Sequence, residues 1–280
     1  MSEERTFTAQ VGEVEFSVST GKLAEQAGGA VALRVGDSML LATATMSKST
    51  REGLDFFPLS VDFEEKMYAA GRIPGSFFRR EGRPSTESIL ICRLTDRPLR
   101  PLFPKGMRNE VQVIITTLSS DSEQHLDIMA VNAASMALVI SDIPWNGPIG
   151  AIRIGYIDGE FVINPSIPQM AESSLDLRMA GTREAIVMVE AGALEVSEEI
   201  ILQAMEFGHS ELQTLIDLQI EMRDEIGKET REVELAQMDE QLQEAVLNRV
   251  GDRIKEVVTQ HTDRTERNSA MDVIREEIVT

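Results

Sequence analysis

The chain has 280 residues, a formal net charge of −20 at pH 7 and a 42% share of hydrophobic residues, which predict a globular protein of roughly two domains. Its apolar runs are shorter than the about 20 residues of a membrane span. Its first residues, MSEERTFTAQ, lack the pattern of a secretion signal or a transit peptide, so we expect a cytoplasmic protein with no membrane partner. One cysteine and three scattered histidines exclude a disulfide framework and argue against a zinc cluster, so we expect no metal ligands.

The first part of the chain has the alternation of a β-sheet. Residues 6–45 alternate between apolar and polar side chains, with turn signals at Gly12 and at Gly36-Asp37, which predicts antiparallel strands joined by hairpins. Residues 56–66 continue as another strand. Residues 68–84 are rich in glycine and proline, which indicates an irregular loop.

A helix is predicted next, over residues 84–97. Ser85 or Thr86 can cap its N-terminus. Pro98 cannot donate to the carbonyl four residues earlier, so we expect the helix to end near Arg97.

Strands and helices continue to alternate after that point. The pattern predicts a buried strand over 111–118, a helix of small residues packed closely on a sheet over 126–141, hairpins over 151–165 and 174–192, and one long helix or two over 197–227. The fold class is therefore α+β, with one layered domain over residues 1–210. Residues 211–280 are predicted to be a helical domain, truncated at its C-terminal end, because their apolar positions recur every three to four residues.

Positive charge is concentrated in one segment of this acidic chain. Residues 71–108 hold nine Lys and Arg against three Asp and Glu. A local positive surface is therefore expected within a molecule that otherwise repels polyanions.

Within this segment, FFRR (Phe77, Phe78, Arg79 and Arg80) joins two chemistries in a glycine-flanked loop, with Arg83 beside it. Arginine forks bind phosphates, and aromatic faces stack unpaired bases. The alternative is an ordinary loop that its phenylalanines anchor to the domain while its arginines form surface ion pairs. The residues alone favour neither interpretation.

Arg93 and Arg97 are four residues apart on the predicted helix, so they share a face and can converge on one anion. Arg100 would follow at the next turn if the helix continued. The alternative is that carboxylates elsewhere in the fold neutralise these arginines. Ser135 has no histidine nearby to activate it, so we assign it to core packing.

Two stretches, GRIPGSFFRREGRPS and ICRLTDRPLRPLFP, resemble the bacterial polynucleotide phosphorylase family, whose members are phosphorolytic exoribonucleases with two cores similar to ribonuclease PH. The resemblance covers the N-terminal portion of such an enzyme, from near Thr6 through EIILQAMEFGH and into the start of its all-helical domain. It implies a ribonuclease PH-like core, of the ribosomal protein S5 domain 2-like type, followed by a small all-α domain.

The resemblance also implies functions for individual residues. In the homotrimeric ring of the family, a pore loop grips single-stranded RNA, a role that passes to Phe77, Phe78, Arg79 and Arg80, with Arg83. Arginines that match Arg93 and Arg97, and Arg100 with them, are expected to hold phosphate or RNA near the active site.

The implied reaction is attack by inorganic phosphate on the 3′ end of RNA, which releases nucleoside diphosphates with Mg²⁺ as cofactor. The second core supplies the catalytic residues. Here the serine pair that holds phosphate falls on Leu126 and Asp127, and two metal-associated aspartates fall on Pro168 and Ser174, which cannot do this work. Asp176 matches a different position and is not assigned as catalytic. We therefore expect this core to be noncatalytic and these 280 residues alone to be inactive.

The leading hypothesis is the N-terminal part of a phosphorolytic 3′-to-5′ exoribonuclease of mRNA turnover, a polyribonucleotide nucleotidyltransferase. Its expected partners are single-stranded RNA, inorganic phosphate, nucleoside diphosphates, two further copies of the chain and RNA degradosome components. The alternative is a non-enzymatic module for RNA binding and trimerisation.

Overall fold

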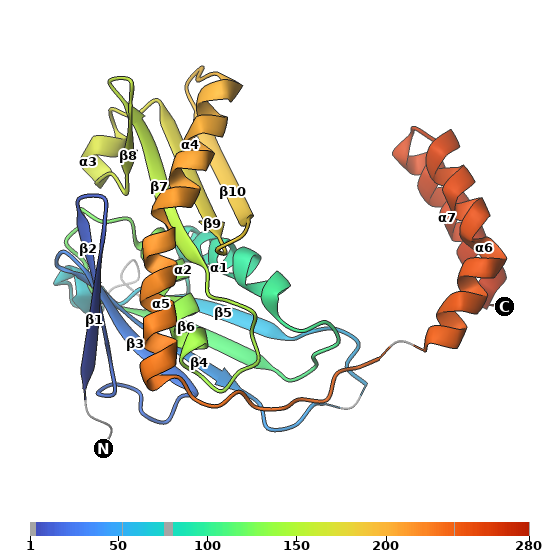
Figure 1. Cartoon of the computed structure of the whole chain (residues 1–280), viewed down its shortest axis with the longest axis horizontal. Coiled ribbons are helices and arrows are strands. Elements are labelled where there is room, and N and C mark those ends of the chain that lie inside the picture. The colour runs from blue at the N-terminus through green and yellow to red at the C-terminus, as the bar shows by residue number, and fades with distance from the viewer. Residues whose placement is uncertain (1–3, 52, 76–80, 238, 280) are drawn as a thin grey trace. The chain divides into compact units, whose positions relative to one another are not determined.

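The computed structural model describes residues 4–51, 53–75, 81–237 and 239–279. The chain forms two compact units, Met1–Leu235 and Ala236–Thr280 (Figure 1). In the described ranges no helix combines the length and the apolarity needed to cross a bilayer.

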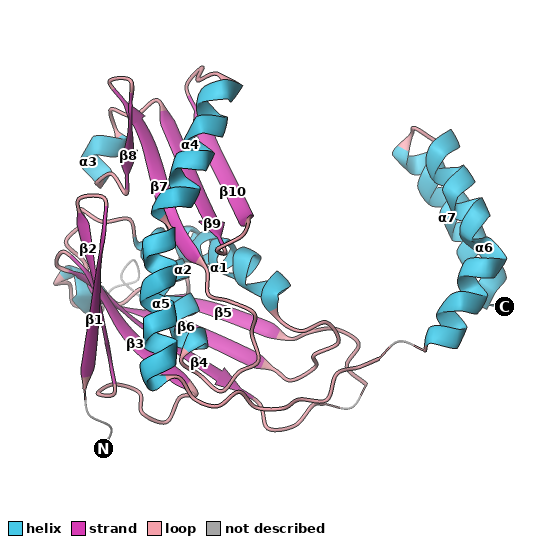
Figure 2. Ribbon diagram, viewed as in Figure 1, coloured by secondary structure: helices cyan, strands magenta, loops and turns pink. Residues whose placement is uncertain are grey.

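A six-stranded sheet forms the first layer of the larger unit (Figure 2). Its strands, in spatial order, are β1 (Arg5–Val11), β2 (Val14–Thr20), β3 (Gly29–Val35), β4 (Ser38–Met46), β6 (Val111–Ser119) and β5 (Leu59–Glu64). The turns at Gly12 and at Gly36-Asp37 join β1 to β2 and β3 to β4 as predicted. Strands β5 and β6 pair in parallel, and this pairing requires a crossover connection.

Helix α1 (Thr86–Leu99) provides that crossover. The Ser85 hydroxyl accepts a hydrogen bond from the Ser88 amide, so the predicted cap is confirmed at Ser85. The predicted end at Arg97 is wrong, because the helix includes Pro98. The proline lies in the last turn, where it removes a single hydrogen bond, while the fully buried Leu99 holds that turn in the core. A short 3-10 turn, η2 (Arg100–Leu102), follows.

A second, antiparallel sheet follows in the chain. It has the order β10 (Ile186–Ala193), β9 (Leu175–Gly181), β7 (Gly150–Ile157) and β8 (Glu160–Ile163). The predicted hairpin turns at Asp158 and Gly159, whose φ angles of 51° and 86° suit a two-residue hairpin loop. Helix α4 (Glu198–Glu211) packs on β7, β8 and β9.

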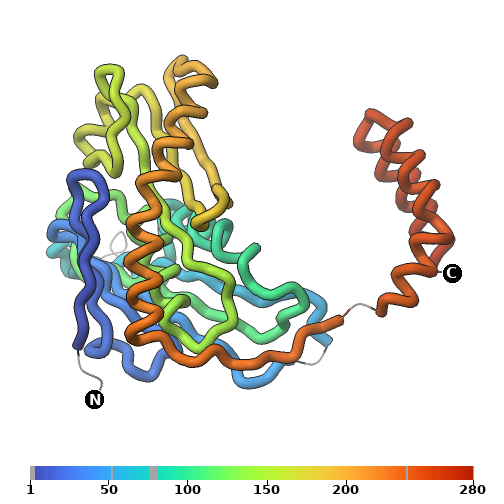
Figure 3. Tube along the Cα trace, viewed as in Figure 1, coloured from blue at the N-terminus to red at the C-terminus, as the bar shows by residue number. Residues whose placement is uncertain are grey.

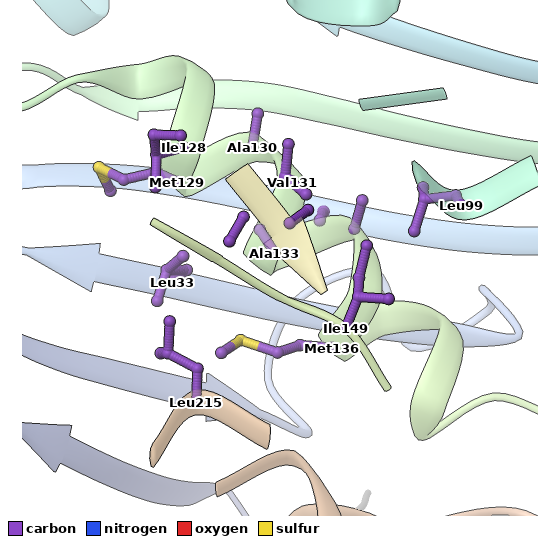
Figure 4. Close-up of a cluster of buried hydrophobic side chains, with 14 of the residues drawn as sticks. Leu33, Leu99, Ile128, Met129, Ala130, Val131, Ala133, Met136, Ile149 and Leu215 are labelled. Carbon is purple, nitrogen blue, oxygen red and sulfur yellow. The ribbon is translucent and has the colours of Figure 1, made fainter. Parts of the chain in front are cut away.

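Helix α2 (Leu126–Val139) forms the centre of the core. It contacts both sheets, and eleven of its residues are buried. Figure 4 shows Met136 of α2 among Leu33, Ile149 and Leu215, which come from surrounding segments. Such a helix needs small residues where backbones approach closely, so the prediction from its composition is confirmed.

Two buried polar side chains fix α2 in place. Asn132 donates to the Ala151 carbonyl and accepts from the Ala151 amide, which joins α2 to β7. Ser135 donates to Gln219 and accepts from the Ile149 amide. Ser135 therefore has a structural role, as its sequence context predicts.

The first unit extends to Leu235, beyond the predicted domain boundary at residue 210. Helix α5 (Gln213–Ile226) lies along β1 and contacts α2, so its apolar face is part of the core (Figure 3). The extended segment 227–235 is then held by hydrogen bonds from the amides of Lys228 and Arg231 to carbonyls of the first unit.

The second unit is a helical hairpin of α6 (Glu240–Gln260) and α7 (Arg264–Val279). Val250 and Ile274 are buried in it, and Arg253 pairs with Glu277 at 2.6 Å. The two helices agree with the predicted helical character of this part of the chain.

The close approach of α2 and β3 yields a stability prediction. A Cβ added at Gly29 would lie 2.0 Å from the Ala137 carbonyl oxygen, a backbone atom that cannot rotate away. We expect Gly29→Ala to lower the free energy of unfolding by at least about 3 kcal/mol, measured by urea titration of this chain. Gly192→Ala, where nothing lies within 4 Å, is the matched control and should change it little. Equal effects of the two substitutions would contradict this packing.

Candidate nucleic-acid interface

An open groove of about 1030 Å³ runs between α1 and β5. Arg93, Arg97 and Arg100 of the α1 segment line one side of it, and Leu59 to Val61 of β5 line the other. Its mixed lining and open shape suit an extended anionic ligand better than a small apolar one.

Cys92 lies at the inner wall of this groove. Its sulfur accepts a hydrogen bond from the Phe63 amide at 3.1 Å, which ties α1 to β5. Burial raises the pKa of the thiol, so Cys92 stays protonated at neutral pH and reacts slowly.

The guanidinium group of Arg100 makes four hydrogen bonds within the chain. It donates to both carboxylate oxygens of Asp96, at 2.9 and 2.6 Å, and to the carbonyls of Phe57 and Leu59, at 3.2 and 3.1 Å. It also lies over the Phe57 ring. Arg100 therefore fixes the wall of the groove and contributes its charge there.

Arg93 and Arg97 differ from Arg100 in their partners. Arg97 donates to Glu190 of β10 at 2.7 Å, and its side chain remains 49% exposed. Arg93 is exposed and forms no ion pair with any described residue. The carboxylate alternative thus holds for Arg97 and Arg100, while Arg93 is available to a ligand.

Three charged side chains lie in one row across the second sheet. Arg153 of β7 is the cross-strand partner of Arg178 of β9, and Arg178 is the partner of Glu190. Like charges at opposite positions destabilise a sheet. The two arginines therefore need carboxylates close to both of them.

Asp176 and Asp127 supply these carboxylates. Asp176 accepts from Arg153 Nε and Nη2 at 2.7 Å each and from Arg178 Nη2 at 3.0 Å. Asp127, in the first turn of α2, has its Oδ2 3.6 Å from Arg153 Nη1 and 3.4 Å from Arg178 Nε. Burial alone would raise the pKa of Asp176, but Arg153 and Arg178 hold it below its ordinary value. We call Asp127, Arg153, Asp176 and Arg178 the charge network.

His125 completes the surroundings of Arg153. Its Nδ1 lies 2.6 Å from Arg153 Nη1 and must accept, because arginine only donates, so the proton of the neutral ring is on Nε2. Burial and the charge of Arg153 lower the pKa of His125 to about 4. The ring is therefore neutral at pH 7.

The residues present do not fit a metal. Across the described ranges, no three His, Cys, Asp or Glu side chains converge on one point. Asp127 and Asp176 are already neutralised by arginines.

The other predicted site residues belong to the segment before α1. Phe77, Phe78, Arg79 and Arg80 lie outside the described residues. Arg83 is exposed. The predicted roles of these residues remain predictions.

Sequence reasoning missed Arg153, Arg178 and Glu190. One signal was present, since Asp176 and Arg178 are two residues apart and so share a face of their strand. The three residues are aligned by the pairing of β7, β9 and β10. Nothing in the sequence near each residue predicts this pairing.

Comparison with known proteins identifies the family of the chain. The sequence pattern of the 3′ exoribonuclease family, domain 1, matches residues 15–144, and that of domain 2 matches residues 147–211. The chain belongs to the 3′ exoribonuclease family. The first match contains the six-stranded sheet from β2 onward with α1 and α2, and the second contains the other sheet with α4. The charge network therefore joins the two family domains.

Curated relatives in this family are named polyribonucleotide nucleotidyltransferase. The protein of Thermomicrobium roseum is 50% identical over 94% of this chain and 33% of its own length. The proteins of Roseiflexus castenholzii and Dehalococcoides mccartyi are 51% and 48% identical over 94% and 98% of this chain, and 35% and 38% of their own lengths. The chain thus spans about a third of the relatives it matches, and the predicted resemblance is confirmed.

A solved structure supports the fold. The crystal structure of rice (Oryza sativa) Rrp46 matches with a TM-score of 0.59 and 19% identity, over 75% of this chain and 94% of that chain. At this identity the match shows the fold alone. The ribonuclease PH-like fold predicted from the sequence is confirmed by this match and by the family domains.

The low pKa of His125 yields a prediction about stability and pH. Between the ordinary value of 6.5 and about 4, the unfolded chain binds a proton at this ring that the folded chain does not bind. The free energy of unfolding therefore falls as the pH falls through this range, by on the order of 2 kcal/mol for a partly exposed ring. The contribution of Asp176 is lost at lower pH, as the pH falls from the ordinary pKa of 3.8 through the lowered pKa of the folded chain.

Urea unfolding of this chain at pH 7 and pH 4.5 measures the effect. His125→Asn is the control, because it keeps an acceptor for Arg153 and cannot titrate. The variant should lose less stability than the wild type between the two pH values. An equal loss would show that His125 does not titrate in this way.

Proposed function

We propose that this chain is part of a phosphorolytic 3′-to-5′ exoribonuclease that degrades single-stranded RNA. An oxygen of inorganic phosphate bonds to the phosphorus of the last phosphodiester, the bond to the 3′ oxygen of the preceding nucleotide breaks, and that oxygen takes a proton. The products are a nucleoside diphosphate and an RNA one nucleotide shorter. Identity of about half the residues to polyribonucleotide nucleotidyltransferases, over nearly the whole chain, is the observation that carries this proposal.

In this proposal the chain binds and guides RNA. Arg93 and Arg97 contact the phosphates of a strand in the groove, and Arg100 holds the groove wall beside them. Phe77, Phe78, Arg79 and Arg80, with Arg83, grip the strand before it reaches the groove. The open, arginine-lined groove within a chain of net charge −20 supports this role.

The catalytic chemistry belongs to a second core in this proposal. The resemblance implies that Asp127 stands where the catalytic core of the family holds phosphate, and here its charge is balanced by Arg153 and Arg178. Mg²⁺ would be bound by the second core. Three copies of the chain would assemble into a cytoplasmic ring, and degradosome components remain candidate partners.

A non-enzymatic module for RNA binding and trimerisation is the second candidate. The charge network favours this candidate, because its carboxylates are already neutralised by its own arginines and do not require a bound substrate or metal for charge balance. The two candidates agree on RNA binding and differ on catalysis.

Phosphate-dependent release of nucleoside diphosphates from an RNA homopolymer distinguishes the two candidates. We expect release by the intact gene product and none by these 280 residues alone, since the catalytic groups are placed outside them. Intact protein that binds RNA without releasing diphosphates would leave the module as the better description.

Alanine substitutions test how the chain holds RNA. Replacing Phe77, Phe78, Arg79 and Arg80 together in the intact protein should weaken single-stranded RNA binding by at least about tenfold. The salt dependence should become shallower by about 0.7 in log–log slope for each phosphate that the variant no longer binds.

Filter binding across a salt series, without phosphate, gives both quantities. Arg34→Ala removes an exposed arginine outside the groove and is the matched control. Wild-type affinity and a normal processive product ladder in the fourfold variant would contradict the assignment.

A further inference from the structure

The carboxylate of Glu190 contacts two arginines at once. Its Oε2 accepts from Arg97 Nη2 at 2.7 Å, and its Oε1 accepts from Arg178 Nη1 at 3.3 Å. Arg97 belongs to the groove and Arg178 to the charge network. Glu190 therefore connects the groove to the joint between the two family domains.

From this geometry we propose that Glu190 is a positioning residue that holds Arg97 in the groove and is displaced from it by an RNA phosphate. The inference rests on the proposed RNA-binding function of the groove. In that function, Arg93 and Arg97 contact the strand in the groove. The inference adds that Glu190 competes with the strand for Arg97.

The exposure of the Arg97–Glu190 pair makes displacement feasible. The two side chains are 49% and 44% exposed, and ion pairs with such exposure shift equilibria by no more than about fivefold. A phosphate oxygen offers Arg97 the same kind of charge-assisted hydrogen bond. The exchange therefore replaces one anion with another and requires little free energy.

The other arginines of the region are not open to such exchange. Arg100 has four hydrogen bonds to fixed partners, two of them backbone carbonyls. Arg153 is 8% exposed and bonded through two nitrogens to Asp176. Among the groove arginines, Arg97 combines a defined orientation with a replaceable partner.

Glu190 does not leave the site when Arg97 changes partner. Its other oxygen stays bonded to Arg178, and its backbone is fixed in β10 between paired positions. The carboxylate thus remains beside Arg97 and competes with an RNA phosphate for its guanidinium. It lowers RNA affinity while keeping the guanidinium of Arg97 oriented.

The expected effect of Glu190→Gln follows from this competition. The amide keeps the size of the side chain and can still accept from an arginine, but it carries no charge. Affinity for single-stranded RNA should rise by about three- to fivefold at low salt, and the gain should shrink as salt screens the charge. A gain in affinity cannot result from misfolding.

A double-mutant cycle separates this effect from a general change in charge. In an Arg97→Ala background, Glu190→Gln should produce little of its gain, because Glu190 acts through Arg97. Glu184→Gln, on the same β9–β10 hairpin, removes the same charge where no ion pair to a described residue is present, and it is the matched control.

Filter binding of a labelled RNA homopolymer to the intact protein, without phosphate, measures all four variants. The proposal is overturned if Glu190→Gln behaves like Glu184→Gln, or if its gain persists in full without Arg97. If Arg97→Ala and the Phe77–Arg80 variant both bind RNA as the wild type does, the proposed function fails instead. The two failures are therefore distinguishable.

Discussion

The burial of Arg153 is the constraint on which the joint between the two family domains depends. A guanidinium that is 8% exposed cannot remain charged without partners, and it cannot lose its proton. Asp176 of the second sheet and Asp127 of α2 meet this need from two different domains. Because both carboxylates must stay beside Arg153, the position of α2 relative to the second sheet is fixed.

The charge network is neutralised within the chain. A site that binds phosphate and a metal must leave cations and carboxylates unsatisfied until the ligands arrive. Here each carboxylate is already matched to an arginine, so the same region stabilises the unit. Of the arginines of α1, Arg97 pairs with Glu190 of the second family domain, while Arg93 is exposed and has no ion pair with a described residue.

Local rules accounted for most of the fold. The hairpin at Asp158-Gly159, the cap at Ser85 and the small-residue helix α2 each follow from side chains within a few positions of one another. The charge network does not, because Asp127 and Asp176 are far apart in sequence and meet only through strand register. The packing of α5 on β1 and α2 was not predicted for a similar reason. An amphipathic stripe shows that one face of a helix is buried, but it does not identify the elements that bury it.

Cys92 gives the groove a property that can be used experimentally. It is the single cysteine of the chain, and it combines a protonated thiol with a hydrogen bond to β5. An alkylating dye would attach at one site, and slowly, because the thiol must first separate from Phe63 and ionise. The rate of attachment is therefore a natural reporter of how often α1 and β5 separate, with no need to introduce a probe.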